Sequence, residues 1–300
     1  MRRPRLPARG FPWAPPTVPR SVDPLPTERT SGPDYDTRWS RRLPARYARF
    51  FVVEGPMRAL VKGLADPLRV GTDRLADVEG PLIFAANHHS HLDAPLLLTS
   101  IPEPWRHKTV VAAAADYFFS NKVTSAASAL ALGAVPVERT KVSRRSSDLA
   151  ADLLTDGWSL IIFPEGGRSP DGWGQGHRGG AAYLAAKTGV PVVPVHLQGT
   201  NRIFAKGDKR PRPGVTKVTF GAPMHPLESD NAVRFAARIE AAVAALADEA
   251  RADWWTARRR AAEGTTPPLT GPDVPSWRRA WALGDRRGRA RRRSPGWPAL

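Results

Sequence analysis

The fold is decided by the stretch Leu82-Ile83-Phe84-Ala85-Ala86-Asn87-His88-His89-Ser90-His91-Leu92-Asp93. The first five residues are apolar and have the length of a strand, the next seven are mostly polar, and an apolar run of helical length follows them. A strand, a polar loop and a helix in this order are typical of an α/β sheet, which carries its sites at the carboxyl ends of its strands. We therefore expect His88 and Asp93 to lie at such an end.

The same alternation of strand-length apolar runs and helical segments continues on both sides of this stretch. The predicted strands are Leu82–Ala86, Thr109–Ala113, Leu160–Phe163, Pro191–His196 and Val215–Phe220. The predicted helices are Leu92–Ser100, Ser120–Leu132, Ser146–Asp156, Gly179–Thr188 and a long one over Asn231–Arg260. The pattern predicts an α/β fold with a mostly parallel or mixed central sheet and helices on both faces. The prolines at 191 and 194 predict an edge or bulged position for their strand.

The formal charge of +17 is concentrated at the two ends of the 300-residue chain. Residues 1–50 contain 11 Arg against 4 acidic residues and residues 251–300 contain 12 Arg against 4, so the middle is close to neutral. We predict a disordered Pro/Arg-rich leader at 1–43 and a basic tail with Pro, Arg and Trp at 264–300. Such tails favour an anionic partner, either a lipid surface or a nucleic acid.

Residues 44–65 carry apolar side chains at helical spacing, and Gly55-Pro56 predicts a division into two short amphipathic helices. One interpretation is a helical element packed on the core. The other is a hairpin that lies in a membrane interface. In the second interpretation the inserted side chains are Phe50, Phe51, Val53, Met57 and Leu60, and the basic side chains elsewhere are Arg46, Arg49, Arg58 and Lys62.

Composition excludes several classes of site and of protein. The chain has no Cys, which excludes disulfides, thiolate metal sites and a cysteine nucleophile. The longest apolar runs reach only about a dozen residues, short of the roughly 18 that cross a bilayer. The Pro-rich amino-terminal stretch offers no apolar segment of the kind that a signal peptide needs, so we do not expect export.

His88 and Asp93 are five residues apart across a strand-loop-helix turn, so their side chains can fold back on each other. A carboxylate that holds one ring nitrogen leaves the other free to take a proton, which makes a general base without a protein nucleophile. A metal site built from the three histidines and the aspartate is an alternative, although their spacing suits it poorly. A merely structural polar turn is a further alternative.

A second polar stretch, Pro164-Glu165-Gly166-Gly167-Arg168-Ser169, follows the strand predicted at 160–163. Consecutive glycines let backbone N–H groups point at an anion, and Arg168 offers a bidentate fork for phosphate. An ordinary tight turn is the alternative interpretation. Two weaker signals are the apolar stretch Gly133–Val137, which ends near Arg139, and the apolar stretch Val190–Val195.

Taken in order, these four stretches resemble the blocks of the glycerolipid acyltransferase family, whose best-known members are 1-acyl-sn-glycerol-3-phosphate acyltransferases. The resemblance covers about residues 65 to 225. It rests on His88 and Asp93, on Gly133 to Arg139, on Phe163-Pro164-Glu165-Gly166 with Arg168-Ser169, and on Val190 to Val195. Two positions depart from the family pattern: Gly167 stands where Thr is common, and His89 where Gln is frequent.

The resemblance implies an acyltransferase domain at 66–263, ending in a long helix, with His88 and Asp93 as catalytic residues. It implies that Arg139, Glu165, Gly166 and Arg168 bind the substrate. The implied reaction moves a fatty acyl group from a thioester donor, acyl-CoA or acyl carrier protein, to lysophosphatidate, with no metal and no further cofactor. Alternatives are a different lysophospholipid, a glycolipid or glycerol 3-phosphate as acceptor, and a nucleic-acid-binding protein that uses its Arg-rich tails.

An acceptor that is an amphiphile in a bilayer, together with the basic tails and the amphipathic residues 44–65, predicts where the protein works. We expect a peripheral enzyme of phospholipid biosynthesis on the cytoplasmic face of the cell membrane, with an anionic membrane surface as a partner. Nucleic acid is not an expected partner, because the body of the chain is close to neutral and shows no recognisable reading module.

Overall fold

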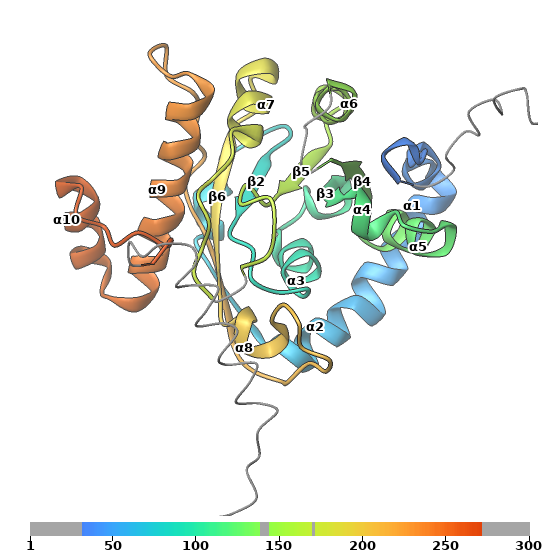
Figure 1. The fold of residues 1–300 in the computed structure, drawn as a ribbon, viewed down its shortest axis with the longest axis horizontal. Helices are drawn as coiled ribbons and strands as arrows, with labels where there is room; N and C mark the ends of the chain where they lie inside the picture. Colours follow the sequence, from blue (N-terminus) through green and yellow to red (C-terminus); the bar gives the residue numbers. More distant parts are fainter. Residues whose placement is uncertain (1–31, 139–143, 170–171, 272–300) are drawn as a thin grey trace, which may run out of the picture.

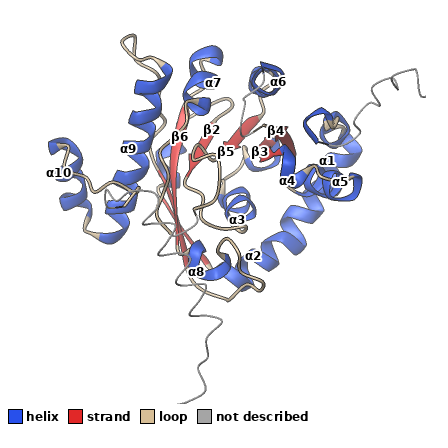
Figure 2. Cartoon of the chain, in the orientation of Figure 1, coloured by secondary structure: helices blue, strands red, loops and turns tan. Residues whose placement is uncertain are grey.

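The computed structural model describes residues 32–138, 144–169 and 172–271. Within them a seven-stranded sheet has the strand order β1-β7-β6-β2-β5-β3-β4. Figures 1 and 2 show this sheet with helices around it. The strands are β1 Pro67–Val70, β2 Ile83–Ala86, β3 Thr109–Ala114, β4 Ala134–Val137, β5 Ser159–Ile162, β6 Val192–Gln198 and β7 Thr216–Phe220. Neighbouring strands are parallel except β6 and β7, which are antiparallel. The predicted α/β class and mixed sheet are confirmed.

Helices cover both faces of the sheet. Their bounds are α1 Leu43–Val52, α2 Arg58–Ala65, α3 Asp93–Ser100, α4 Ala115–Phe118, α5 Lys122–Ala131, α6 Arg144–Thr155, α7 Gly180–Thr188, α8 Thr200–Phe204, α9 Ala232–Arg251 and α10 Trp254–Glu263. Alternate residues of β2 enter different cores: Phe84 packs with residues of α2 and α3, and Ile83 packs with α6, α7 and α9. This alternation is the period of two of a strand that is buried on both faces.

Two short edge strands were not predicted, and the long carboxyl-terminal helix is two helices. β1 and β4 have four residues each and lie at opposite edges of the sheet, so each makes only one ladder and has a weak pattern. The helix predicted over Asn231–Arg260 breaks after Arg251. Asp253 begins α10 there, since its Oδ1 accepts a hydrogen bond from the backbone N–H of Thr256 at 2.9 Å.

The edge position predicted for the strand with two prolines is wrong, because β6 lies between β7 and β2. The carbonyl of Pro194 accepts a hydrogen bond from Gly221 N at 2.8 Å, so the nitrogen of Pro194 faces the β7 side as well. The paired residues of β6 and β7 begin only at Val195 and Phe220. The N–H that Pro194 lacks therefore faces the end of the β6–β7 ladder and not β2, and a central strand tolerates it there.

The amino-terminal element is one continuous helical rod rather than a hairpin (Figure 1). A π-helical turn, Val53–Met57, contains Pro56 and joins α1 to α2 without a break in direction. Residues four apart form its buried face: Arg49, Val53, Met57, Val61 and Ala65. Val53 and Met57, predicted to insert into a membrane, therefore belong to the protein core.

Arg49 is also on the buried face, against the expectation that it belongs to the basic side. Its guanidinium donates to the carbonyls of Thr109 at 2.7 Å and Leu132 at 3.2 Å, at the start of β3 and just after α5. Burial lowers the pKa of Arg49 to about 10. This side chain ties the amino-terminal rod to β3 and to the end of α5.

The end of the predicted disordered leader is ordered. Residues 32–42 form two 3₁₀ turns, Gly32–Asp34 and Arg38–Arg41. Tyr35 packs its ring 5.6 Å from that of Phe119, and Thr37 and Ser40 are buried. The predicted boundary at residue 43 is therefore too late. In the described part of the chain, no helix combines the length and apolar character that a membrane span requires.

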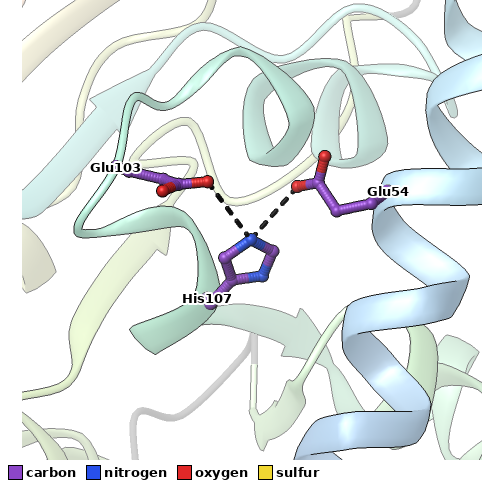
Figure 3. A group of neighbouring side chains, drawn as sticks. All are labelled: Glu54, Glu103 and His107. Carbon is purple, nitrogen blue, oxygen red and sulfur yellow. Dashed lines mark ion pairs between the residues drawn. The ribbon is translucent and has the colours of Figure 1, made fainter.

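Glu54, Glu103 and His107 form a cluster that fastens the π-helical turn to the 3₁₀ turn Arg106–Lys108 (Figure 3). His107 Nε2 lies 3.1 Å from one Glu54 oxygen, and Arg106 Nη1 lies 3.0 Å from the same oxygen. Arg58 pairs with the second oxygen of Glu54. Because two guanidinium groups already neutralise this carboxylate, we interpret the cluster as an ion-pair clamp and not as a metal site.

Candidate active site

The loop between β2 and α3 brings His88 and Asp93 together. His88 Nδ1 lies 2.9 Å from Asp93 Oδ2, and the same oxygen accepts hydrogen bonds from the backbone N–H groups of His89 at 2.6 Å and Ser90 at 2.7 Å. The Asp93 side chain is fully buried, whereas that of His88 is 20% exposed. The carboxylate is thus held by the loop that it orients, and the imidazole remains accessible.

The ring of Phe163 stacks on that of His88 with a centroid distance of 4.2 Å. Phe163 follows β5, the neighbour of β2 in the sheet, so two adjacent strand ends position the imidazole from different sides. The sequence placed Phe163 in a motif but assigned it no role, because a ring contact across strands has no local signature.

Glu165 holds the loop through both oxygens of its side chain, and it is not among the residues that line the apolar cavity beside His88. Its Oε1 accepts from His88 N at 2.9 Å and its Oε2 accepts from Gln175 N at 3.0 Å. The side chain is buried, and burial raises its pKa to about 7 against the opposing effect of these hydrogen bonds. Its hydrogen bonds are those of a residue that shapes the loop, and its assignment to substrate binding stays a prediction.

Gly166 and Arg168, unlike Glu165, line the apolar cavity beside His88. Gly166 has a φ of +71°, a backbone conformation that favours glycine. A Cβ at this position would also lie only 2.7 Å from the guanidinium carbon of Arg178. Arg168 Nη1 contacts His91 Nε2, and its guanidinium carbon lies 5.4 Å from the ring centre of Tyr117. Burial, with Arg168 as the second cause, lowers the pKa of His91, which favours the neutral ring that can accept from Arg168.

Arg139, the other predicted phosphate ligand, lies outside the described residues. His91 and Tyr117 were not predicted as site residues. His91 stands in the quoted first stretch, but its contact with Arg168 crosses 77 residues of sequence. Only the folded chain reveals that it helps to place that side chain.

An apolar cavity of about 200 Å³ extends from His88 and Arg168 into the molecule. Its apolar walls come from both sides of the sheet end and from the helices that cover it, and include Ala94, Val111, Leu132, Ala150, Ile162 and Leu184. A general base and a cation at an apolar cavity suit a substrate with a fatty chain and an anionic head.

Comparison with known proteins agrees with this geometry. Residues 67–198 match the family model named Acyltransferase. Over 143 residues the chain is 34% identical to a chloroplastic 1-acyl-sn-glycerol-3-phosphate acyltransferase of Brassica napus, covering 46% of this chain and 39% of the relative. Over 165 residues it is 32% identical to the chloroplastic enzyme of that name from Arabidopsis thaliana, covering 53% of this chain and 44% of the relative.

A solved structure is similar over a larger share. The 1-acyl-sn-glycerophosphate acyltransferase PlsC of Thermotoga maritima superimposes with a TM-score of 0.55 at 25% identity, covering 73% of this chain and 84% of the other. Against the curated relatives, by contrast, the chain spans only 39% to 50% of the length of the first three. The resemblance drawn from the four sequence blocks is confirmed: residues 67–198 match the Acyltransferase model, and the chain is similar to 1-acyl-sn-glycerol-3-phosphate acyltransferases.

Proposed function

We propose that this protein transfers a fatty acyl group from a thioester donor to the free hydroxyl of lysophosphatidate and so makes phosphatidate. The observation that carries the proposal is that His88, paired with the buried Asp93, lines an apolar cavity together with Arg168. The names of the similar proteins support the same acceptor.

In the proposed reaction His88 acts as a general base. With Nδ1–H donated to Asp93, the lone pair of Nε2 accepts the proton of the acceptor hydroxyl as its oxygen attacks the thioester carbonyl. The tetrahedral intermediate then expels the thiolate as the carbon–sulfur bond breaks, and the thiolate takes the proton back from the imidazolium. Buried Asp93 stabilises the imidazolium between these steps, and no acyl-enzyme is required.

The acyl chain of the donor and the phosphate of the acceptor need different environments, and the cavity offers both. Apolar walls suit the acyl chain, because burying each methylene group contributes about 0.8 kcal/mol. Arg168 suits the phosphate, because charge-assisted hydrogen bonds to a phosphate are stronger than neutral ones. We propose Arg139 as a second phosphate ligand. No cofactor beyond the thioester co-substrate enters the proposal.

We further propose that the protein works as a peripheral protein on an anionic membrane surface, at the cytoplasmic face of the cell membrane. On the amino-terminal rod Leu43, Tyr47 and Phe51 lie four residues apart and are 63%, 66% and 70% exposed. This exposed stripe is on the side away from the buried face, and the basic residues Arg42 and Arg46 directly precede its first two members. An apolar stripe with flanking arginines fits a lipid interface.

The direct test is to identify the product. Purified protein incubated with lysophosphatidate and a mixture of acyl donors is expected to yield phosphatidate by mass spectrometry. His88→Ala should lower turnover by roughly 10²- to 10⁴-fold, which is the usual contribution of a positioned general base. Asp93→Asn should lower it less, with melting temperature retained in both. Near-native turnover of His88→Ala would overturn the catalytic assignment, and a product other than phosphatidate would replace the acceptor.

A further inference from the structure

The segment that follows α10 turns back and contacts a loop of the candidate active site. α10 ends at Glu263, and residues 264–271, which we call the carboxyl-terminal strap, return from it towards the middle of the molecule (Figure 1). The far end of the strap lies on Trp173 and Gly174, in the loop that joins the Arg168 block to α7. The strap therefore connects the carboxyl-terminal helices to a loop that belongs to the site.

Two contacts fasten the strap to this loop. Gly174 is buried, and its N–H donates a hydrogen bond to the carbonyl of Leu269 at 2.8 Å. Gly271 lies so close to the ring of Trp173 that a Cβ at position 271 would be 2.5 Å from the nearest ring carbon. A Cβ at Gly174 would lie 3.2 Å from the Cβ of Leu269. Glycine at both positions thus lets the two segments approach each other closely.

The loop that the strap holds is also the loop that holds Glu165. Residues 172–179 form no helix or strand, so their backbone groups depend on partners from other segments. Directly after Gly174, the N–H of Gln175 donates to Glu165 Oε2 at 3.0 Å. The other oxygen of this carboxylate accepts from the backbone N–H of His88 at 2.9 Å. Because peptide groups are planar and joined at one Cα, the position of Gly174 constrains the direction of the next N–H.

The side chain of Gln175 extends this connection to the proposed phosphate ligand. Its amide donates to the carbonyl of Gly167 at 3.4 Å and to that of Arg168 at 3.5 Å. Both distances are at the long end for a hydrogen bond, so a small shift of the loop breaks these contacts. A displacement of about 1 Å that starts far from the reacting atoms can lower a rate by roughly 10²-fold. A contact made at the strap can therefore affect the reaction.

We propose that the carboxyl-terminal strap is a positioning element of the active site: by holding Gly174 it keeps Glu165 and Arg168 in place. The strap touches neither residue and acts through Gln175, whose backbone binds the first and whose side chain binds the backbone of the second. The effect on turnover rests on the proposed acyl transfer, whereas the effect on the loop rests on these contacts alone.

Two substitutions in the full chain displace the strap from opposite sides, and each has a matched control. Gly174→Ala places a Cβ against the strap, whereas Gly176→Ala, in the same loop, meets no atom within 4 Å. Gly271→Ala places a Cβ against the loop at a φ of +77°. Gly207→Ala carries the same kind of backbone strain, at a φ of +97°, but in open space. Melting curves verify that all four variants fold.

Two measurements do not depend on acyl transfer. Hydrogen exchange followed by NMR should show the amide of residue 174 exchanging about 10-fold or more faster in both strap variants, because its acceptor has moved. Burial raises the pKa of Glu165 to about 7, and hydrogen bonds from His88 N and Gln175 N oppose this rise. Loss of the bond from Gln175 should therefore raise this pKa further, by about 0.5 or more, in a carbon-13 NMR titration. Both quantities should stay at their wild-type values in the two controls.

Steady-state kinetics gives the third measurement. Both strap variants should lower kcat/KM for lysophosphatidate by about 10-fold or more, with little change in the Michaelis constant for the acyl donor. A merely structural strap would lower the melting temperature and leave the kinetic constants and the pKa of Glu165 unchanged.

The proposal is overturned if the amide of residue 174 exchanges in both variants as it does in wild type, since the strap then does not hold the loop. It is also overturned if this amide exchanges faster while the pKa of Glu165 and kcat/KM stay at their wild-type values. If wild type does not acylate lysophosphatidate, the proposed function fails. The exchange and titration measurements then still decide whether the strap positions Glu165.

Discussion

Glu165 is a buried acid whose hydrogen bonds join both loops of the site. Because burial shifts its pKa, its ionisation should change the free energy of unfolding with pH. Folding raises its pKa from 4.5 to about 7, so the unfolded chain ionises it more readily. Its contribution to stability is therefore present at pH values below about 4.5 and is lost as the pH rises through about 7.

Glu165→Gln should remove this loss. The free energy of unfolding of the variant, relative to wild type, should increase between pH 5 and pH 8 by on the order of 1 to 3 kcal/mol. Urea unfolding at several pH values measures it, and Glu263→Gln on exposed α10 is the matched control. A difference that does not change with pH would show that the carboxyl does not titrate in this window.

Among the described residues Arg168 contacts the imidazole of His91 and the ring of Tyr117, and the proposed function assigns its charge to the acceptor phosphate. Arg168→Ala should raise the Michaelis constant for lysophosphatidate by about 10- to 100-fold, the equivalent of roughly 1.5 to 3 kcal/mol. The Michaelis constant for the acyl donor should stay nearly constant. Steady-state kinetics with each substrate varied in turn decides it, and an equal rise for both would indicate a structural role in the loop.

At the scale of the element, the amino-terminal rod has two faces with different roles. Tyr47→Asp combined with Phe51→Asp alters only the exposed stripe, so it should weaken vesicle binding while leaving the melting temperature near that of wild type. The loss should persist in 1 M salt, where the Debye length shrinks to about 3 Å and attraction between charges is screened. Co-sedimentation with anionic vesicles measures the bound fraction.

Two controls make this result specific. Val233→Asp introduces a charge at a 76% exposed position of α9 and should not affect vesicle binding. Met57→Asp should lower the melting temperature, because Met57 packs in the core next to α2 and α3. If the double variant of the stripe binds vesicles as wild type does in 1 M salt, the rod is a structural element only.

For the whole molecule, the apolar cavity depends on how the sheet and its covering helices pack. Ala150 of α6 lines it from the helical layer, so Ala150→Phe should shorten the space for an acyl chain. We expect kcat/KM to fall by at least about 10-fold for long-chain donors, since each methylene group contributes about 0.8 kcal/mol, and to fall less for short ones. Assays across donor lengths test this.

The matched control is Ala186→Phe, on the exposed side of α7. It should leave the dependence on chain length unchanged. A uniform loss for all chain lengths in Ala150→Phe would mean that the cavity does not hold the chain, or that the helical layer has shifted.

The local sequence pattern was sufficient to predict the central strands, most of the helices and the pairing of His88 with Asp93. Strand and helix periods are short-range properties, and five residues across one turn can reach each other without help from the rest of the chain. The same locality explains the failures. β1 and β4 lie at the two edges of the sheet and pair on one side only, and the start of α10 after α9 depends on the capping side chain of Asp253.

The sequence by itself therefore determined the α/β class, the order of the motif blocks and the chemistry available at them. Only the tertiary structure decided which face of the amino-terminal rod is buried, that β6 is central, and that Glu165 braces His88. It also decided that the strap after α10 contacts the loop at Gly174. The physical reason is that burial and convergence are set by contacts between residues far apart in the chain, whose free energies no local spacing encodes.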